Sequence, residues 1–176
     1  MSEPGMNGKH TISCLVENHF GVLARIAGLI SARGFNIDSL TVSATEDPTI
    51  SRMTIVVDAD ALKLEQVKRQ LDRLIDVIEV EELKEGEFID RELLLVRVAA
   101  GAAKRGELLN VAETVGGKVA DTGEQWVVIE AMGDTTRLDA LIERLRPFGI
   151  LQLVRTGRIA MPRRDAPQRA AAPSAR

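Results

Sequence analysis

The feature that most constrains the fold is an order of secondary-structure elements that occurs twice. The first half of the chain predicts a strand, a helix, two strands, a helix and a strand, and the second half predicts the same order again. Such a repetition indicates two copies of one structural unit, and βαββαβ is the order of the ferredoxin-like fold. The sequence therefore predicts an α+β protein with two ferredoxin-like domains, each an antiparallel four-stranded sheet covered by two helices.

Hydrophobic periodicity places these elements along the chain. Alternating or β-branched apolar runs predict strands, and apolar residues spaced three and four apart predict helices. In the first half the predicted strands are 10–16, 37–44, 52–57 and 76–83, and the predicted helices are 22–33 and 64–75. In the second half the predicted strands are 92–100, 118–121, 125–132 and 150–160, and the predicted helices are 105–115 and 135–148.

Composition sets the expected domain boundaries. The chain is expected to divide into a flexible N-terminus (1–8), a first domain (9–83), a charged connector (84–90), a second domain (91–161) and a tail (162–176). The tail is rich in Pro, Ala and Arg and is expected to be disordered, because such a composition cannot bury enough apolar surface to fold. Each domain is close to the lower size limit for independent stability, which favours association with a neighbour.

Composition also argues against several classes of function. A net charge of -3 and an aromatic content of 3% favour neither nucleic acid nor an anionic membrane as a partner. No apolar run approaches the ~18 residues of a membrane span, and the N-terminus does not resemble a signal peptide. We therefore expect a soluble, cytoplasmic protein, with its single cysteine, Cys14, buried as a small hydrophobe.

Residues that could perform catalysis are scarce. The only histidines are His10 and His19, and no Cys/His cluster has the spacing of a metal site. No nucleophile elbow, Walker loop or dinucleotide-binding glycine pattern is present. Glu65, Asp72 and Asp76 are expected on solvated helix faces. No catalytic residue and no metal ligand is predicted.

The one candidate binding site lies in "VENHFGVLARIAGLISARGFNID", residues 16–38, which predicts a helix between two glycine turns. The start of this helix offers free backbone N–H groups and a partial positive charge, which bind carboxylates. Gly21 allows close approach of the backbone, so a side chain there is expected to crowd the turn. Asn18 could cap the free N–H groups or bind a ligand, and Gly34 is expected to cap the far end.

A second amide, Asn36, lies beyond the far end of this helix, about 18 Å from Asn18 at the usual rise per residue. One small ligand cannot easily contact both in the same chain. Two chains packed antiparallel would bring Asn36 of one to the Asn18 turn of the other, and a symmetric dimer would then hold two such pockets. The spacing alone leaves open a simpler interpretation, in which the two asparagines belong to a cap and a turn without a ligand.

At this point the sequence resembles a known family. The segments "EN..GVLARIAGL", "RGFNIDSLTV" and "SRMTIVV" occur together and in order, followed by "QLDRLIDVIEV" and "RELLLVRV" and more weakly by "PFGILQLVRTGRIAM". They resemble the small, regulatory subunit of acetolactate synthase (acetohydroxyacid synthase), over roughly residues 9–161. The resemblance implies that the first domain is an ACT domain, which binds amino acids at a dimer interface, and that the chain has no active site.

The resemblance also implies a partner and an effector. The partner is a large catalytic subunit that uses thiamine diphosphate, magnesium and FAD, which the small subunit activates. The effector is a branched-chain amino acid, most often valine, with leucine and isoleucine as further candidates, and it inhibits the complex. The implied effector contacts are Asn18, Gly21, Val22 and Leu23 of one chain and Asn36 and Ile37 of the other chain in a homodimer, with His19 and Phe20 of the same turn as further candidates.

One residue departs from the family pattern. Phe20 stands where relatives often have proline or a small residue, and it is expected to cover the pocket, change its size or pack outward. Three other functions remain open at this stage: a free-standing ACT regulator of transcription or of an unrelated enzyme, an RNA-binding ferredoxin-like module, and an independent enzyme. The predicted inner strands lack the aromatics of the RNA-binding module, and no acid–base or nucleophilic set supports the enzyme.

Overall fold

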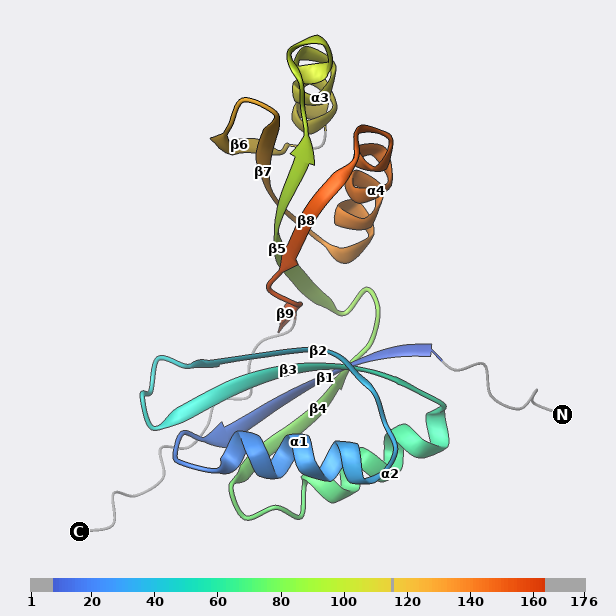
Figure 1. Ribbon diagram of the computed structural model, residues 1–176. Helices are drawn as coiled ribbons and strands as arrows, with labels where there is room; N and C mark the ends of the chain where they lie inside the picture. Colours follow the sequence, from blue (N-terminus) through green and yellow to red (C-terminus); the bar gives the residue numbers. More distant parts are fainter. Residues whose placement is uncertain (1–7, 115, 164–176) are drawn as a thin grey trace, which may run out of the picture.

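The computed structural model describes residues 8–114 and 116–163 and confirms the two ferredoxin-like domains (Figure 1). The first domain consists of β1 (Gly8–Glu17), α1 (Val22–Ala32), β2 (Ile37–Ala44), β3 (Ile50–Ala59), α2 (Ala61–Leu71) and β4 (Val77–Leu83). Its four strands are antiparallel in the order β2-β3-β1-β4. Both helices cover the same face of this sheet. The predicted flexible residues 1–7 and the predicted tail from 164 onward lie outside the described residues.

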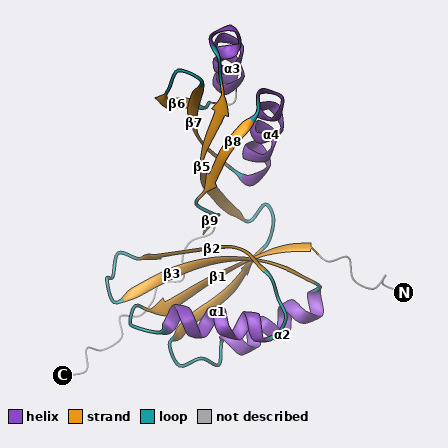
Figure 2. Cartoon of the chain, viewed as in Figure 1, coloured by secondary structure: helices purple, strands orange, loops and turns teal. Residues whose placement is uncertain are grey.

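The second domain repeats this arrangement (Figure 2). It consists of β5 (Phe88–Ala99), α3 (Ala102–Thr114), β6 (Lys118–Thr122), β7 (Trp126–Gly133), α4 (Thr135–Leu145), the short 3-10 turn η1 (Arg146–Phe148), β8 (Ile150–Arg155) and β9 (Ile159–Pro162). The main sheet has the antiparallel order β6-β7-β5-β8, and β9 pairs separately with the first residues of β5.

Several predicted boundaries are wrong, and strand pairing explains those that follow. Gly8, predicted to be flexible, belongs to β1 because it pairs with Ala59. β5 begins at Phe88, inside the predicted connector, because Phe88 pairs with Pro162, which had been assigned to the tail. The single strand predicted over 150–160 is two strands, β8 and β9, because the chain turns at Gly157, where φ is 83° and an L side chain would be strained.

Each domain has its own hydrophobic core between its sheet and its helices. The buried residues of the first core are Ile12, Cys14, Val16, Val22, Ile26, Ile30, Phe35, Met53, Ile55, Val57, Ala59, Leu64, Val67 and Leu71. The buried residues of the second core are Leu94, Val96, Val98, Ala100, Leu108, Ala112, Val127, Ile129, Ala131, Leu138, Leu141 and Leu145. The predicted burial of Cys14 is confirmed, and this burial raises the pKa of the thiol to about 12.

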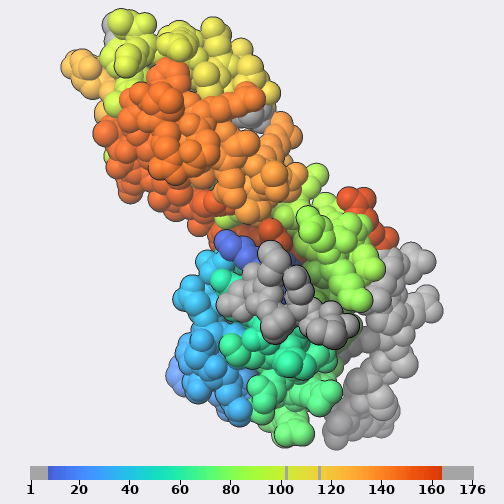
Figure 3. Space-filling model, turned by 90° about the vertical axis from the view of Figure 1, so that its right-hand side faces the viewer, coloured from blue at the N-terminus to red at the C-terminus, as the bar shows by residue number. Residues whose placement is uncertain are grey.

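The second domain stands on the first sheet, on the face opposite to α1 and α2 (Figures 1 and 3). The contact is made by the loop between β8 and β9, which reaches β1 and β2. The start of α1 is therefore on the far side of the first domain from this contact. No helix in the described part of the chain is long and apolar enough to cross a membrane.

Candidate binding site at the start of helix α1

Helix α1 begins without a side-chain cap. Its N-cap is Gly21, with φ 89° and ψ -13°, and no side chain among the described residues caps the first turn. The other described α-helix N-caps are different, because Asp60 accepts from the Lys63 N–H and Asp134 accepts from the Arg137 N–H, each at 2.8 Å. Among the α-helices with a described N-cap, α1 is thus the one whose first N–H groups lack a capping side chain and can meet a carboxylate.

Gly21 is required for its backbone conformation rather than for space. The expectation that a side chain would crowd this turn is wrong, because a Cβ built on Gly21 meets no atom within 4 Å. The constraint is the positive φ of 89°, a conformation that L residues rarely adopt. The space beside Gly21 that a Cβ would occupy is therefore open.

Asn18 does not cap the helix, so that part of the prediction is also wrong. Its Nδ2 donates to the Pro48 carbonyl at 2.9 Å, and its backbone N–H donates to the Thr49 carbonyl at 2.7 Å. The physical reason is position, since Gly21 occupies the N-cap and Asn18 precedes it by three residues. Asn18 instead ties the turn before α1 to the loop between β2 and β3.

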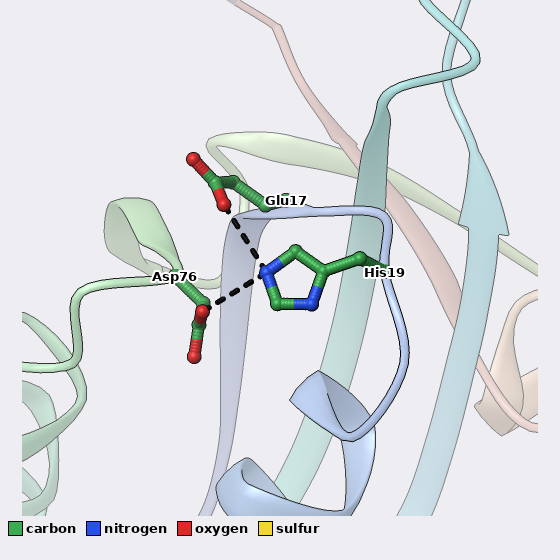
Figure 4. Close-up of side chains that lie close together, drawn as sticks. All are labelled: Glu17, His19 and Asp76. Atoms are coloured by element: carbon green, nitrogen blue, oxygen red, sulfur yellow. Dashed lines mark ion pairs between the residues drawn. The ribbon is translucent and has the colours of Figure 1, made fainter.

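A cluster of charged side chains fixes the other side of the turn (Figure 4). His19 Nε2 lies 3.2 Å from Glu17 Oε2 and 3.1 Å from Asp76 Oδ1. Asp76 Oδ2 pairs with Arg25 Nη2 at 2.9 Å, and the Asp76 carbonyl accepts from the Glu17 N–H. Asp76 was predicted on a solvated helix face, but it follows α2 in the loop before β4, and its side chain is only 8% exposed.

This cluster also has the composition of a metal site. The ligand atoms of Glu17, His19 and Asp76 all lie within 4.8 Å of one another, and one imidazole with two carboxylates suits a zinc-like ion. His19 Nδ1, however, faces the Phe20 carbonyl at 3.2 Å, so both ring nitrogens face acceptors. Arg25 pairs with Asp76 as well, so every member of the cluster has a partner within it. The geometry is accounted for by this ion-pair cluster.

The remaining predicted residues lie at both ends of α1. Val22 is buried in the first core, so only its backbone N–H can face a ligand at the turn. Leu23 is half-exposed, and Phe20 is fully exposed in the single chain. Asn36 is exposed at the other end, where its Nδ2 donates to Asp38 Oδ1 at 3.2 Å. Ile37, also at that end, packs at the edge of the first core.

The structure does not bring the two predicted amides together within one chain. Asn18 and Asn36 lie beyond opposite ends of the 11-residue helix α1, which spans about 16 Å at 1.5 Å per residue. In a binding site that used both amides, the turn around Gly21 and the segment around Asn36 would be two separate half-sites. Such a site would require a second chain.

The fold defines a two-domain protein whose first domain is of the ACT type. Residues 12–79 match the family model described as the AHAS small subunit-like ACT domain, and residues 91–164 match the model described as the small subunit of acetolactate synthase.

Curated relatives agree with the family models. A probable acetolactate synthase small subunit of Archaeoglobus fulgidus is 48% identical over 155 residues, which cover 88% of this chain and 97% of that protein. The acetolactate synthase small subunit of Mycobacterium leprae is 45% identical, covering 88% of this chain and 91% of that protein. The crystal structure of the small subunit from Thermotoga maritima matches with a TM-score of 0.81 at 32% identity, covering 90% of this chain and 99% of that one. The chain therefore belongs to the family of acetolactate synthase small subunits.

Proposed function

We propose that this chain is the regulatory subunit of an acetolactate synthase, which activates a large catalytic subunit and makes it sensitive to feedback inhibition. The effector is a branched-chain amino acid, with valine as the first candidate and leucine and isoleucine as the next. Family membership supports the role as a subunit. The observation that carries the effector site is the start of α1, which lacks the capping carboxylate that α2 and α4 have.

In this proposal the effector's carboxylate takes the place of the missing cap. It accepts hydrogen bonds from the backbone N–H groups that follow Gly21, where the helix dipole favours a negative charge. The half-exposed Leu23 offers an apolar surface to the effector's side chain. Phe20 of the same turn is fully exposed, and in this proposal it contacts either the effector or a second chain.

The proposal requires a homodimer through the ACT domains. Asn36 of the second chain closes the pocket over the effector, because within one chain it lies at the far end of α1. A two-fold axis between the ACT domains then makes two equivalent pockets. The proposal assigns thiamine diphosphate, magnesium and FAD to the large subunit, so this chain acts only by changing the large subunit's activity.

Reconstitution tests this function. The large subunit is assayed for acetolactate formation alone, with this chain, and with this chain plus valine, leucine or isoleucine. We expect no synthesis by this chain alone, higher activity when it is added, and a decrease with at least one of the three amino acids. Unchanged activity on addition of the chain would contradict the regulatory role, and full activity with all three amino acids would contradict feedback inhibition.

A further inference from the structure

The loop of residues 156–158, between β8 and β9, connects the two domains through hydrogen bonds. The Arg158 carbonyl accepts a hydrogen bond from Thr41 Oγ1 on β2. The Arg158 guanidinium donates from Nη1 to Thr11 Oγ1 on β1 at 2.7 Å. Both threonines belong to the first domain, so one residue of the second domain contacts the two strands of the ACT sheet that flank β3.

The same guanidinium is held by the second domain. Its Nη2 donates to Thr135 Oγ1 at the start of α4 at 2.9 Å, and its Nε lies 3.2 Å from Asp90 Oδ2 on β5. The Arg158 side chain is 20% exposed and stacks over the Phe88 ring at 5.9 Å. Hydrogen bonds from a charged donor are about twice as strong as neutral ones, so Arg158 resists separation of the two domains at this point.

Gly157 brings the backbone of this loop directly onto β2. A Cβ on Gly157 would lie 3.1 Å from the Ser39 Cβ, which is closer than a normal packing contact, and 3.6 Å from the Thr41 Cγ2. Gly157 is buried and has φ 83°. The glycine therefore lets the backbone of the loop lie close to Ser39 on β2, with no side chain of residue 157 between them.

β2 also begins at the half-site that contains Asn36. Ile37 and Ser39 are separated by a shift in the pairing with β3, which marks a bulge at Asp38. Asp38 accepts from Asn36 Nδ2 at 3.2 Å and pairs with Lys9 Nζ at 3.0 Å. Bulges re-aim side chains near binding sites. A displacement of Asn36 thus has a short path, through Asp38 and Ser39, to the loop at the second domain.

A cavity of about 340 Å³ lies beside this contact and is lined by residues of both domains. Its first-domain wall carries the Lys9–Asp38 ion pair, and its second-domain wall carries Arg155 bound to Glu92 and Asp139. These ion pairs each lie within one domain. A small rotation of one domain on the other would therefore leave them intact while it strained the bonds at Arg158.

We propose that β2 and Arg158 form a coupling joint that transmits occupation of the effector site to the second domain. This inference rests on the proposed function, because it assumes that an effector contacts Asn36. When the effector fixes Asn36 and Asp38, the contacts of Ser39 and Thr41 with the loop favour one orientation of the second domain. Effector binding and domain orientation are then thermodynamically linked, which is the requirement for an allosteric device.

Two variants and one control test the joint in the reconstituted complex. Thr41→Val removes the hydroxyl that binds the Arg158 carbonyl, and Arg158→Met removes the guanidinium while keeping a long side chain. Thr122→Val, on the exposed strand β6, is the matched control. We expect both joint variants to bind valine within about two-fold of the wild-type affinity and to activate the large subunit, but to lose at least half of the maximal inhibition. The control, Thr122→Val, should keep the full maximal inhibition.

Hydrogen exchange of the small subunit gives a readout that does not need the large subunit. We expect valine to change amide exchange in residues 150–162 of the wild type and of Thr122→Val, and not in Thr41→Val. If Arg158→Met does not fold, Thr41→Val decides. Full inhibition together with wild-type exchange changes in Thr41→Val would refute the coupling joint and leave the proposed function standing. A wild-type chain that binds none of the three amino acids would overturn the proposed function and the joint with it.

Discussion

Gly21→Asp is expected to abolish effector binding while the chain remains folded. The backbone at this residue has φ 89°, and there is open space around an added Cβ. The structural cost is therefore the left-handed conformation, about 1–2 kcal/mol for a residue with a side chain. A carboxylate near the first turn of α1 recovers roughly 0.3–1 kcal/mol of this through the helix dipole. The net loss in the free energy of unfolding should be about 1 kcal/mol.

The effect on binding should be larger than the effect on folding. The new carboxylate competes for the N–H groups that the effector would use, and a hydrogen bond to a charged group is worth about 1.5–3 kcal/mol. Loss of one such bond corresponds to roughly 10- to 150-fold weaker binding. Added repulsion between two carboxylates should bring the affinity below the range that calorimetry detects.

A matched control separates strain from charge at the site. Gly86 has φ 84° and also meets no atom within 4 Å of an added Cβ, and it lies in the loop between β4 and β5. Gly86→Asp should therefore lose a similar amount of stability in urea and bind valine normally. Gly21→Asn should adopt the left-handed turn without adding a charge, and it should keep part of the affinity for valine. Wild-type valine affinity in Gly21→Asp would refute the assignment of the carboxylate to this helix start.

Three further predictions concern buried or capping groups. Asp76→Asn should lower the free energy of unfolding by about 1–3 kcal/mol, because Arg25 loses its charge partner, and urea titration should show almost no change for the exposed neighbour Asp72→Asn. The backbone N–H groups of α2 lower the pKa of Asp60, so the charge of Asp60 stabilises the fold above the unfolded pKa and this contribution is lost as the pH falls. The difference in the free energy of unfolding between the wild type and Asp60→Asn should therefore shrink between pH 7 and pH 3. A constant difference would contradict this. Cys14, whose pKa is raised to about 12, should react with a thiol reagent at pH 8 only after unfolding, and rapid reaction of the native protein would contradict its burial.

The architecture could be predicted because local periodicity and the structure agree. Apolar residues at helical spacing, such as Leu138, Leu141 and Leu145 on α4, are the same ones that the core buries. The order of elements then determines the ferredoxin-like sheet. The pairing of β5 with β9 could not be predicted in this way, since Phe88 follows the polar run "KEGE" and its partner Pro162 lies in a segment that resembles a tail.

Only part of the candidate site could be predicted, because only part of it depends on the local sequence. Gly21 and the open helix start follow from a local pattern, whose glycine and apolar spacing are visible in the sequence. The contact of His19 with Asp76 depends on the pairing of β1 with β4, which brings together residues 57 positions apart. The bond from Asn18 to Pro48 depends likewise on the loop between β2 and β3. No local spacing indicates either contact.

Complementation between two effector-insensitive chains tests the shared pocket most directly. Gly21→Asp should remove the half-site at the start of α1, and Asn36→Ala should remove the other half-site. In a heterodimer of these chains, one pocket carries both changes and the other carries neither. After equal mixing and subunit exchange, the account predicts that valine binding returns at about a quarter of the wild-type number of sites, with the wild-type affinity. No recovery from the mixture, with heterodimers shown to be present, would contradict a pocket built from two chains.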